Sequence, residues 1–540
     1  MRVADYIVKY LENNNVKNVY GIPAGTVGAL YDALEDTNIQ LIVTKNEAAA
    51  TYAATRYASI SHKLGVCCFA GGVGLNNAIN GIAEASRSKV PVLIISGYVN
   101  RWQIGKGAVQ ELNTEMITAP ITKYSKTILK NEEVAYELKK AIKIALTPPY
   151  GPVHLSIPID MQIDVFEGDI NSMEPPITEE IEYDNYNLSS ACELINNSNT
   201  GVIMVGKGAR GLKEDIKELS TKLKWPIITT PEGKGVINSD FALNLGNYGF
   251  CSSDYAAEFI DNAKVDCLLI LGSSLGESAT RNFNDVLVED KKVIHIDWDK
   301  NELNRVFKAD VAVYHDLHKA LPFLLDNVLE KDNDFAKPEV NKPYVCNHTG
   351  LSTRLFLEKV VDIVPENTYF ISDIGEYMNF IFKYLPLKQT MDFDISLNYG
   401  AMGAGVTGVM GAYAANPARP YSVIVGDGSF FMNGIEVLTA KEYRMPIIYF
   451  VINNSMLGYV EHGQKFIYGR SSEGFSYERV SIKDMVQALG IKAFQMSTVE
   501  ELENIKECLM NINEPIVVEL VTDGTEKVPV ADRFKALSNK

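Results

Sequence analysis

The sequence predicts an α/β protein built from three doubly wound parallel-sheet domains, and three observations lead to this prediction. The chain has 540 residues, which is too long for one domain of ordinary size. Short apolar runs alternate with helical stretches along its whole length, as expected when helices cross over between parallel strands. Two polar, proline-containing stretches, 166–187 and 331–349, interrupt the alternation and are typical of linkers. We therefore expect domains at 1–165, 188–330 and 350–540.

Charge and composition limit the classes of function. The net charge is −17, so neither nucleic acid nor an anionic membrane is an expected partner. The seven cysteines form no CxxC pair and no Cys/His cluster, which argues against a disulfide framework and a zinc site. Residues 1–8 begin an amphipathic helix rather than a signal peptide. The uncharged stretch 399–418 is mainly Gly and Ala and predicts a tightly packed internal helix rather than a membrane span, so we expect a cytoplasmic protein.

In the first domain, an apolar strand is expected to end at Thr44, and Glu47 then opens a helix rich in small residues. A glutamate in the first turn commonly stabilises the helix dipole, so Glu47 by its position alone has a structural explanation. Further strands are expected at 64–70 and 91–96.

In the middle domain, Gly206-Lys-Gly208-Ala-Arg-Gly211 follows an apolar strand and fits the G-x-G-x-x-G pattern at a helix start. This leaves open a nicotinamide or flavin oxidoreductase. The pattern is weak, because Gly403 to Gly408 matches it too.

The third domain carries the most informative motif. A buried strand at 421–425 leads into Gly426-Asp427-Gly428, a helix is expected over 434–444, and a second strand at 447–452 leads into Asn453-Asn454. Asp427 and Asn454 should therefore lie at the carboxyl ends of two strands, where open α/β sheets bind ligands. A carboxylate and an amide oxygen suit Mg²⁺ completed by phosphate oxygens, and the glycines let backbone N–H groups approach a diphosphate.

The first and third domains also share a cryptic repeat. Gly71 and Pro91 are 20 positions apart, as are Gly426 and Pro446, and each pair joins one apolar strand to the next through a helix. The shared spacing and element order predict two domains of similar fold.

The GDG motif, followed 27 positions after Asp427 by Asn454, resembles the cofactor-anchoring signature of thiamine-diphosphate (ThDP) enzymes. The resemblance implies a pyrimidine-binding first domain, a diphosphate-binding third domain, bound ThDP and Mg²⁺. It also implies a homo-oligomer, dimer or tetramer, with active sites between subunits. The metal ligands would be Asp427, Asn454 and Met456. The residues that it places at the cofactor are Gly25, Gly375, Glu376, Tyr377, Gly400, Met402, Gly426, Asp427, Gly428, Ser429, Asn454, Met456, Leu457, Gly458 and Tyr459.

The same resemblance assigns roles to single residues. Glu47 would hydrogen-bond the aminopyrimidine ring and so activate the cofactor. Met402, 25 positions before Asp427, would be the apolar wedge beneath the two rings, although an ordinary core methionine has the same character. The carbonyl of Gly400 would accept a hydrogen bond from the aminopyrimidine.

Three segments, 19–25, 107–124 and 233–237, are similar to the acetolactate synthase branch. That branch decarboxylates a 2-oxo acid, here expected to be pyruvate, and joins the product to a second carbonyl. Gln110 would lie beside the reacting carbon and donate to a carbonyl or alkoxide, unless it is a solvated loop residue.

Departures from the branch keep alternatives open. Gly463 stands where the branch has Trp, Tyr459 where it has Met, and Glu461 adds an acid. Glu461 is either a proton donor, as in the pyruvate decarboxylase branch, or a surface helix glutamate, so a non-oxidative 2-oxo acid decarboxylase is the alternative function. FAD in the middle domain is less expected than an empty domain, because segment 272–281 lacks the usual early basic residue; a flavin oxidase is less favoured still. A non-catalytic regulator is disfavoured because Glu47 and Asp427 are both present.

Overall fold

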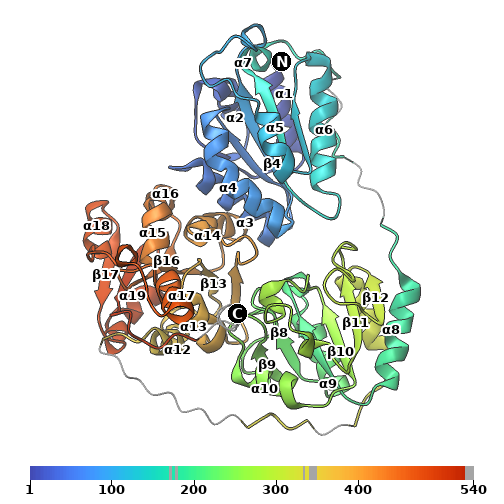
Figure 1. Ribbon diagram of the computed structural model, residues 1–540. Coiled ribbons are helices and arrows are strands. Elements are labelled where there is room, and N and C mark those ends of the chain that lie inside the picture. Colours follow the sequence, from blue (N-terminus) through green and yellow to red (C-terminus); the bar gives the residue numbers. More distant parts are fainter. Residues whose placement is uncertain (170–172, 177–180, 333–334, 340–349, 530–540) are drawn as a thin grey trace.

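The computed structural model describes residues 1–169, 173–176, 181–332, 335–339 and 350–529. These residues form three six-stranded sheets in which every strand pair is parallel. Helices flank each sheet, and the three layered units are separate bodies of the ribbon, as Figure 1 shows. The predicted fold class is confirmed. The expected linkers 166–187 and 331–349 fall partly outside the described residues.

The N-terminal sheet has the strand order β2-β1-β3-β4-β6-β5. Its strands are β1 Asn18–Gly21, β2 Gln40–Val43, β3 Gly65–Phe69, β4 Val92–Tyr98, β5 Tyr124–Thr127 and β6 Val153–Pro158. The helices are α1 Val3–Asn13, α2 Gly28–Leu34, α3 Glu47–Ser61, α4 Val73–Ser88, α5 Thr114–Thr118, α6 Val134–Ala145 and α7 Ile159–Ile163. The helix that the sequence predicts to open at Glu47 begins at that residue.

The C-terminal sheet repeats this arrangement, with the order β14-β13-β15-β16-β18-β17. Adding twelve to each strand number of the first sheet reproduces it, so the predicted similarity of the two folds is confirmed. The strands are β13 Tyr369–Ser372, β14 Asp392–Ile395, β15 Tyr421–Gly426, β16 Ile447–Asn453, β17 Lys492–Met496 and β18 Ile516–Val521. The helices are α12 Thr353–Ile363, α13 Tyr377–Tyr384, α14 Ala404–Ala415, α15 Asp427–Asn433, α16 Val437–Glu442, α17 Gly458–Tyr468, α18 Ile482–Ala488 and α19 Lys506–Met510.

One helix starts earlier than expected. The predicted helix over 434–444 is preceded by α15, which begins at Asp427 itself, and α16 ends at Glu442. The GDG motif is therefore both the end of β15 and the first turn of a helix, which brings backbone N–H groups to the strand end.

The middle sheet has the order β12-β11-β10-β7-β8-β9. Its strands are β7 Gly201–Val205, β8 Ile227–Thr229, β9 Asn244–Asn247, β10 Cys267–Leu271, β11 Lys292–Asp297 and β12 Val311–Tyr314. The helices are α8 Asn185–Asn197, α9 Lys213–Leu223, α10 Asp254–Asn262 and α11 Leu317–Asn327.

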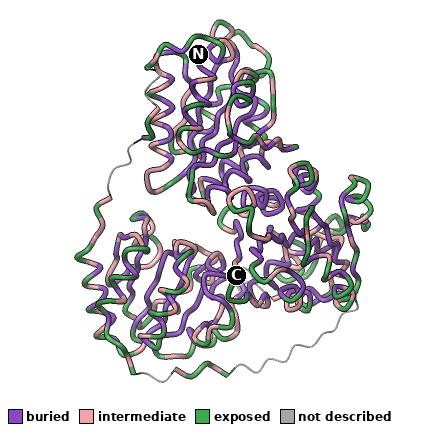
Figure 2. Tube along the Cα trace, turned by 180° about the vertical axis from the view of Figure 1, so that it is seen from behind, coloured by how far each residue is buried: buried purple, intermediate pink, exposed green. Residues whose placement is uncertain are grey.

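The central strands are buried on both faces, which explains their continuous apolar sequences. Every residue of β4, β10 and β16 is buried. Figure 2 shows the same distribution, with buried segments inside each unit and exposed ones along the outer helices. Among the described residues, no helix combines the length and apolarity needed to cross a membrane.

The N- and C-terminal units pack through α3 and α14, which lie side by side in Figure 1. Gly411 makes the close approach possible, because a Cβ there would lie 1.8 Å from the backbone oxygen of Ala53. The buried Arg56 of α3 forms an ion pair with Asp394 of β14 and donates to Ser396 Oγ at 2.9 Å. The small residues of both helices thus serve a helix–helix contact between units. The tightly packed helix predicted within 399–418 is α14.

Candidate active site

A cavity of about 630 Å³ opens at the carboxyl edge of the C-terminal sheet. It is lined by every residue of the C-terminal domain that the sequence placed at the cofactor or metal, and Glu461 is not among the lining residues. These lining residues are Gly375, Glu376, Tyr377, Gly400, Met402, Gly426, Asp427, Gly428, Ser429, Asn454, Met456, Leu457, Gly458 and Tyr459. Residues from four separate stretches of sequence therefore meet at one place.

Asp427 and Asn454 are both oriented by the backbone. Asp427 Oδ1 accepts from the N–H of Gly428 at 2.8 Å, and Oδ2 accepts from the N–H of Ser455 at 2.8 Å. Asn454 Oδ1 accepts from the N–H of Met456 at 3.2 Å. The second of these bonds joins the end of β15 to the residues after β16, so the two predicted ligands are held at adjacent strand ends.

The chemistry of this pair fits a hard cation. Burial raises the pKa of Asp427 to about 6, against hydrogen bonds that lower it, and a cation beside it would favour the ionised form. Among the described residues, no three His, Cys, Asp or Glu side chains gather as a metal-binding group. A site here would instead combine one carboxylate, one amide and the backbone oxygen of Met456, a set that suits Mg²⁺ completed by phosphate oxygens.

The motif glycines leave room at the cavity floor. A Cβ on Gly428 would lie 3.3 Å from Leu457 Cδ2 and 3.4 Å from Met402 Cε, so both side chains close over this glycine. Met402 thus lies beside the GDG turn, and its role as the wedge stays a prediction. Gly400, with φ of +78°, is in the left-handed region that glycine adopts without strain.

Asp373, which sequence reasoning missed, positions this segment. Its buried carboxylate accepts from the N–H groups of Gly403, Gly405 and Val406 at 2.8 to 3.1 Å and so caps the start of α14. Met402 immediately precedes this capped turn. The available signal was a Ser-Asp pair at the carboxyl end of an apolar strand, where open α/β sheets place polar site residues. That Asp373 caps a helix starting 30 positions later is set by the tertiary structure.

The predicted residues of the N-terminal domain lie outside this cavity. Glu47 Oε2 accepts from Asn77 Nδ2 of α4 at 3.0 Å, and Glu47 Oε1 would lie 3.1 Å from a Cβ on Gly74. Gln110 is an exposed residue with φ of +67°. Its backbone oxygen packs against Gly72, two positions before Gly74. The structure therefore gathers Glu47 and Gln110 at the start of α4. Gly25 is exposed in the turn after β1 at the same carboxyl edge of the sheet.

Comparison with known proteins identifies the family. Residues 1–117, 188–324 and 373–520 match the N-terminal TPP binding domain, the central domain and the C-terminal TPP binding domain of thiamine pyrophosphate enzymes. A probable acetolactate synthase large subunit of Methanocaldococcus jannaschii is 30% identical, over 100% of this chain and 95% of that protein. The chain belongs to the thiamine pyrophosphate enzyme family.

Further relatives show where its similarity lies within the family. The acetolactate synthase large subunit of Lactococcus lactis is 30% identical over 97% of this chain and 92% of that protein. The isozyme 2 large subunit of Escherichia coli is 27% identical over 98% and 97%. The predicted class, an acetolactate synthase-like enzyme dependent on ThDP (thiamine pyrophosphate), is confirmed.

In this thiamine pyrophosphate enzyme, the side chain of Glu461 does not line the cavity and is bound to residues of its own domain. Its carboxylate accepts from Lys465 Nζ at 2.7 Å and from Ser476 Oγ at 2.9 Å. The next residue, His462, instead forms an ion pair with Glu376, which lines the cavity. Successive helical side chains differ by about 100° in direction, so the two neighbours meet different partners. The sequence indicated only Glu461, and its role as a proton donor stays a prediction. His462 is the residue of α17 that sequence reasoning missed.

The middle domain of the enzyme borders a second cavity, of about 790 Å³. The G-x-G-x-x-G motif does not open an α-helix as expected: it holds only the short 3₁₀ helix Lys207–Ala209, and α9 begins at Lys213. Gly206 and Gly208 instead allow close packing against the loop after β10, since a Cβ on Gly206 would lie 2.2 Å from the oxygen of Gly272. The glycines thus have a packing role, and the expectation that FAD is absent stays a prediction.

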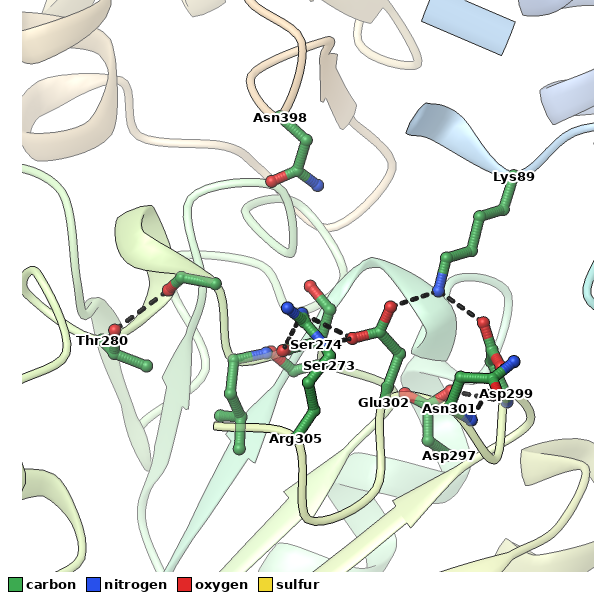
Figure 3. A network of polar contacts seen from close by, with 12 residues as sticks. Lys89, Ser273, Ser274, Thr280, Asp297, Asp299, Asn301, Glu302, Arg305 and Asn398 are labelled. Atoms are coloured by element: carbon green, nitrogen blue, oxygen red, sulfur yellow. Dashed lines mark hydrogen bonds and ion pairs between the residues drawn. The ribbon is translucent and has the colours of Figure 1, made fainter. Parts of the chain in front are cut away.

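Two acids after β11, Asp299 and Glu302, are paired across the domain boundary, and Glu302 lines this second cavity. Lys89, at the end of α4, reaches Asp299 at 2.5 Å and also forms an ion pair with Glu302 (Figure 3). Arg305 pairs with Glu302 and donates to the oxygen of Ser274 at 3.0 Å. Ion pairs of Lys89 therefore connect the N-terminal and middle domains beside this cavity.

Proposed function

We propose that the enzyme uses ThDP and Mg²⁺ to decarboxylate a 2-oxo acid, with pyruvate as donor, and joins the resulting two-carbon unit to a second carbonyl. The observation that supports this most is the convergence of Asp427, Asn454 and the glycine turns on one cavity at a sheet edge. The acetolactate synthase names of its relatives support the same reaction class.

In this proposal, Asp427, Asn454 and the backbone oxygen of Met456 hold the metal, and the turns at Gly426–Gly428 and Gly458 face the diphosphate. ThDP, when bound, supplies the electron sink for loss of CO₂. Met402 and Leu457, which close over Gly428, would lie against the bound cofactor and exclude water from the reacting atoms. Three helices, α13, α15 and α17, begin at the cavity, and their first N–H groups favour an anion there.

We further propose that a second copy of the chain supplies Glu47 and Gln110. Both residues gather at the start of α4, outside the cavity of their own chain. Glu47 would form a hydrogen bond with the aminopyrimidine ring of the cofactor and so activate it. Gln110, which does not titrate, would donate to the substrate carbonyl. A dimer or tetramer in solution is required by this arrangement.

The acceptor pocket would be formed by the middle domain together with α17. Phe250, Phe283 and Tyr459 line the cavity on this side, and Gly463 is buried in α17 where the branch usually has Trp. The substitution removes a large side chain, so we propose that larger carbonyl acceptors than pyruvate are also accepted.

The test is product analysis with purified protein, ThDP, Mg²⁺ and pyruvate. We expect CO₂ release with acetolactate as product, detected by NMR of ¹³C-labelled pyruvate. Acetaldehyde as the sole product would establish the decarboxylase alternative, and hydrogen peroxide with a co-purified flavin would establish the oxidase. No CO₂ release with pyruvate or with longer 2-oxo acids would overturn the proposal.

A further inference from the structure

A carboxylate lies where the diphosphate of the cofactor is proposed to bind. Glu376 precedes α13, lines the cavity, and has a side chain only 12% exposed. Its Oε2 would lie 2.5 Å from a Cβ at position 458, and Asn454 Nδ2 would lie 3.0 Å from the same point. Gly458 therefore makes the space that Glu376 occupies, directly beside a proposed metal ligand.

This placement is unfavourable for an anion unless the charge is compensated. Three other acids line the same cavity: Asp427 and Glu526 of the C-terminal domain and Glu277 of the middle domain. A metal ion would neutralise Asp427, and Glu526 accepts from Ser352 Oγ and the N–H of Thr353 at 2.7 Å at the start of α12. Glu376 has neither a metal ion nor such donors beside it. Without another partner, its negative charge would therefore repel a diphosphate in the cavity at short range.

His462 supplies the compensation. It lies on the second turn of α17, and its Nδ1 forms an ion pair with Glu376 Oε1. The hydrogen bond to Glu376 raises the pKa of His462, against burial and Lys465, which lower it; Glu461 raises it slightly further. The pair also connects α13 to α17, two of the helices that begin at the cavity.

We infer that His462 is a positioning residue that neutralises Glu376 and holds it against Gly458, so that the cavity accepts the diphosphate of ThDP. The inference rests on the proposed cofactor site. It gives His462 no contact with the reacting atoms. Its effect is on cofactor affinity, through the charge and direction of the Glu376 carboxylate.

The experiment measures ThDP affinity of the full-length protein by titration calorimetry at saturating Mg²⁺, with no substrate. Four proteins form a double-mutant cycle: wild type, His462→Gln, Glu376→Gln and the double variant. Gln at 462 keeps an N–H donor and removes the imidazole ring together with its charge. Lys465→Gln is the matched control, because it removes a cation from the same helix that pairs with Glu461 instead.

We expect His462→Gln to weaken ThDP binding about tenfold, since a bare carboxylate then faces the diphosphate. Glu376→Gln should bind at least as tightly as wild type, the double variant within about threefold of Glu376→Gln, and Lys465→Gln within about twofold of wild type.

Other results would overturn the inference. Unchanged affinity in His462→Gln would show that the pair has no electrostatic role. Weaker binding in Glu376→Gln would show that the carboxylate serves the cofactor or metal directly. A double variant as weak as His462→Gln would assign the effect to lost packing, and the circular dichroism melting curves of the apo proteins separate this from misfolding. If wild type itself takes up no ThDP, the proposed cofactor site fails, and not this inference alone.

Discussion

Asn77 Nδ2 donates a hydrogen bond to Glu47 Oε2 at 3.0 Å and holds that carboxylate at the start of α4. One turn further along α4, Asn80 accepts from the hydroxyl of Tyr399 at 3.1 Å, and Tyr399 lines the cavity of the C-terminal domain. Within one chain, Glu47 is therefore held one helical turn from a residue that contacts the cavity rim, but does not itself line the cavity.

Replacing Glu47 by Gln should separate activation from binding. Gln keeps an acceptor for Asn77 but cannot carry the charge needed in the proposed role. We expect turnover to fall by about 10² or more, while the ThDP dissociation constant changes less than about threefold. Steady-state CO₂ release and calorimetry measure the two quantities. Wild-type turnover in Glu47→Gln would remove this residue from the mechanism.

Replacing Asp427 by Asn should act on binding first. Asn keeps an oxygen for the N–H of Ser455 but removes the negative charge from the proposed metal site. We expect ThDP affinity in the presence of Mg²⁺ to fall about a hundredfold, or about 2.7 kcal/mol. The control is Glu473→Gln, an exposed acid outside the cavity lining, which should leave affinity unchanged. Similar losses in both variants would point to net charge rather than a specific site.

Two glycines of α14 provide a matched test of the contact between the terminal domains. A Cβ on Gly411 would lie 1.8 Å from the backbone oxygen of Ala53, whereas one on Gly408 would meet its nearest atom, Arg56 Cβ, at 3.5 Å. We expect Gly411→Ala to cost about 2 to 4 kcal/mol of unfolding free energy. Gly408→Ala should lie within about 1 kcal/mol of wild type, because ordinary contact is accompanied by better helix propensity. Urea unfolding monitored by circular dichroism compares them, and equal stabilities would contradict the packing described.

The stability of the middle domain should depend on pH through Asp297. This residue, 4% exposed at the end of β11, accepts from the N–H of Asp299 at 2.8 Å, and burial raises its pKa to about 7. Since the folded-state pKa lies above the unfolded one, its stabilising contribution is complete below about pH 4 and is lost as pH rises through about 7.

Asp297→Asn cannot ionise and should therefore be more stable than wild type at high pH. We expect an advantage that grows between about pH 4 and 7 and reaches about 1 to 3 kcal/mol at pH 8. Urea unfolding at pH 5 and pH 8 measures it. A stability difference that does not change with pH would show that Asp297 does not titrate in this range.

Much of the fold was predictable because its signals are local. Apolar runs of strand length between helical stretches are enough to predict parallel sheets, and the equal spacing at Gly71 and Gly426 predicted that the terminal domains share one topology. The GDG and NN motifs lie directly after strands, so their meeting at one sheet edge follows from parallel topology alone. The helix beginning at Glu47 was predictable for the same reason.

Other features depend on the directions of side chains that are far apart in sequence. Lys89 and Asp299 are 210 positions apart, and no sequence pattern indicates their pairing. Likewise, the choice between Glu461 and His462 is made by the rotation of α17 against α13, because adjacent helical residues point to different neighbours. The three-sheet fold, the family and the placement of the GDG and NN motifs at strand ends could all be read from the sequence, since they depend on the spacing of residues along the chain. Which charges face the cavity could not be read from the sequence, because burial and the packing of helices from different segments determine where each side chain points.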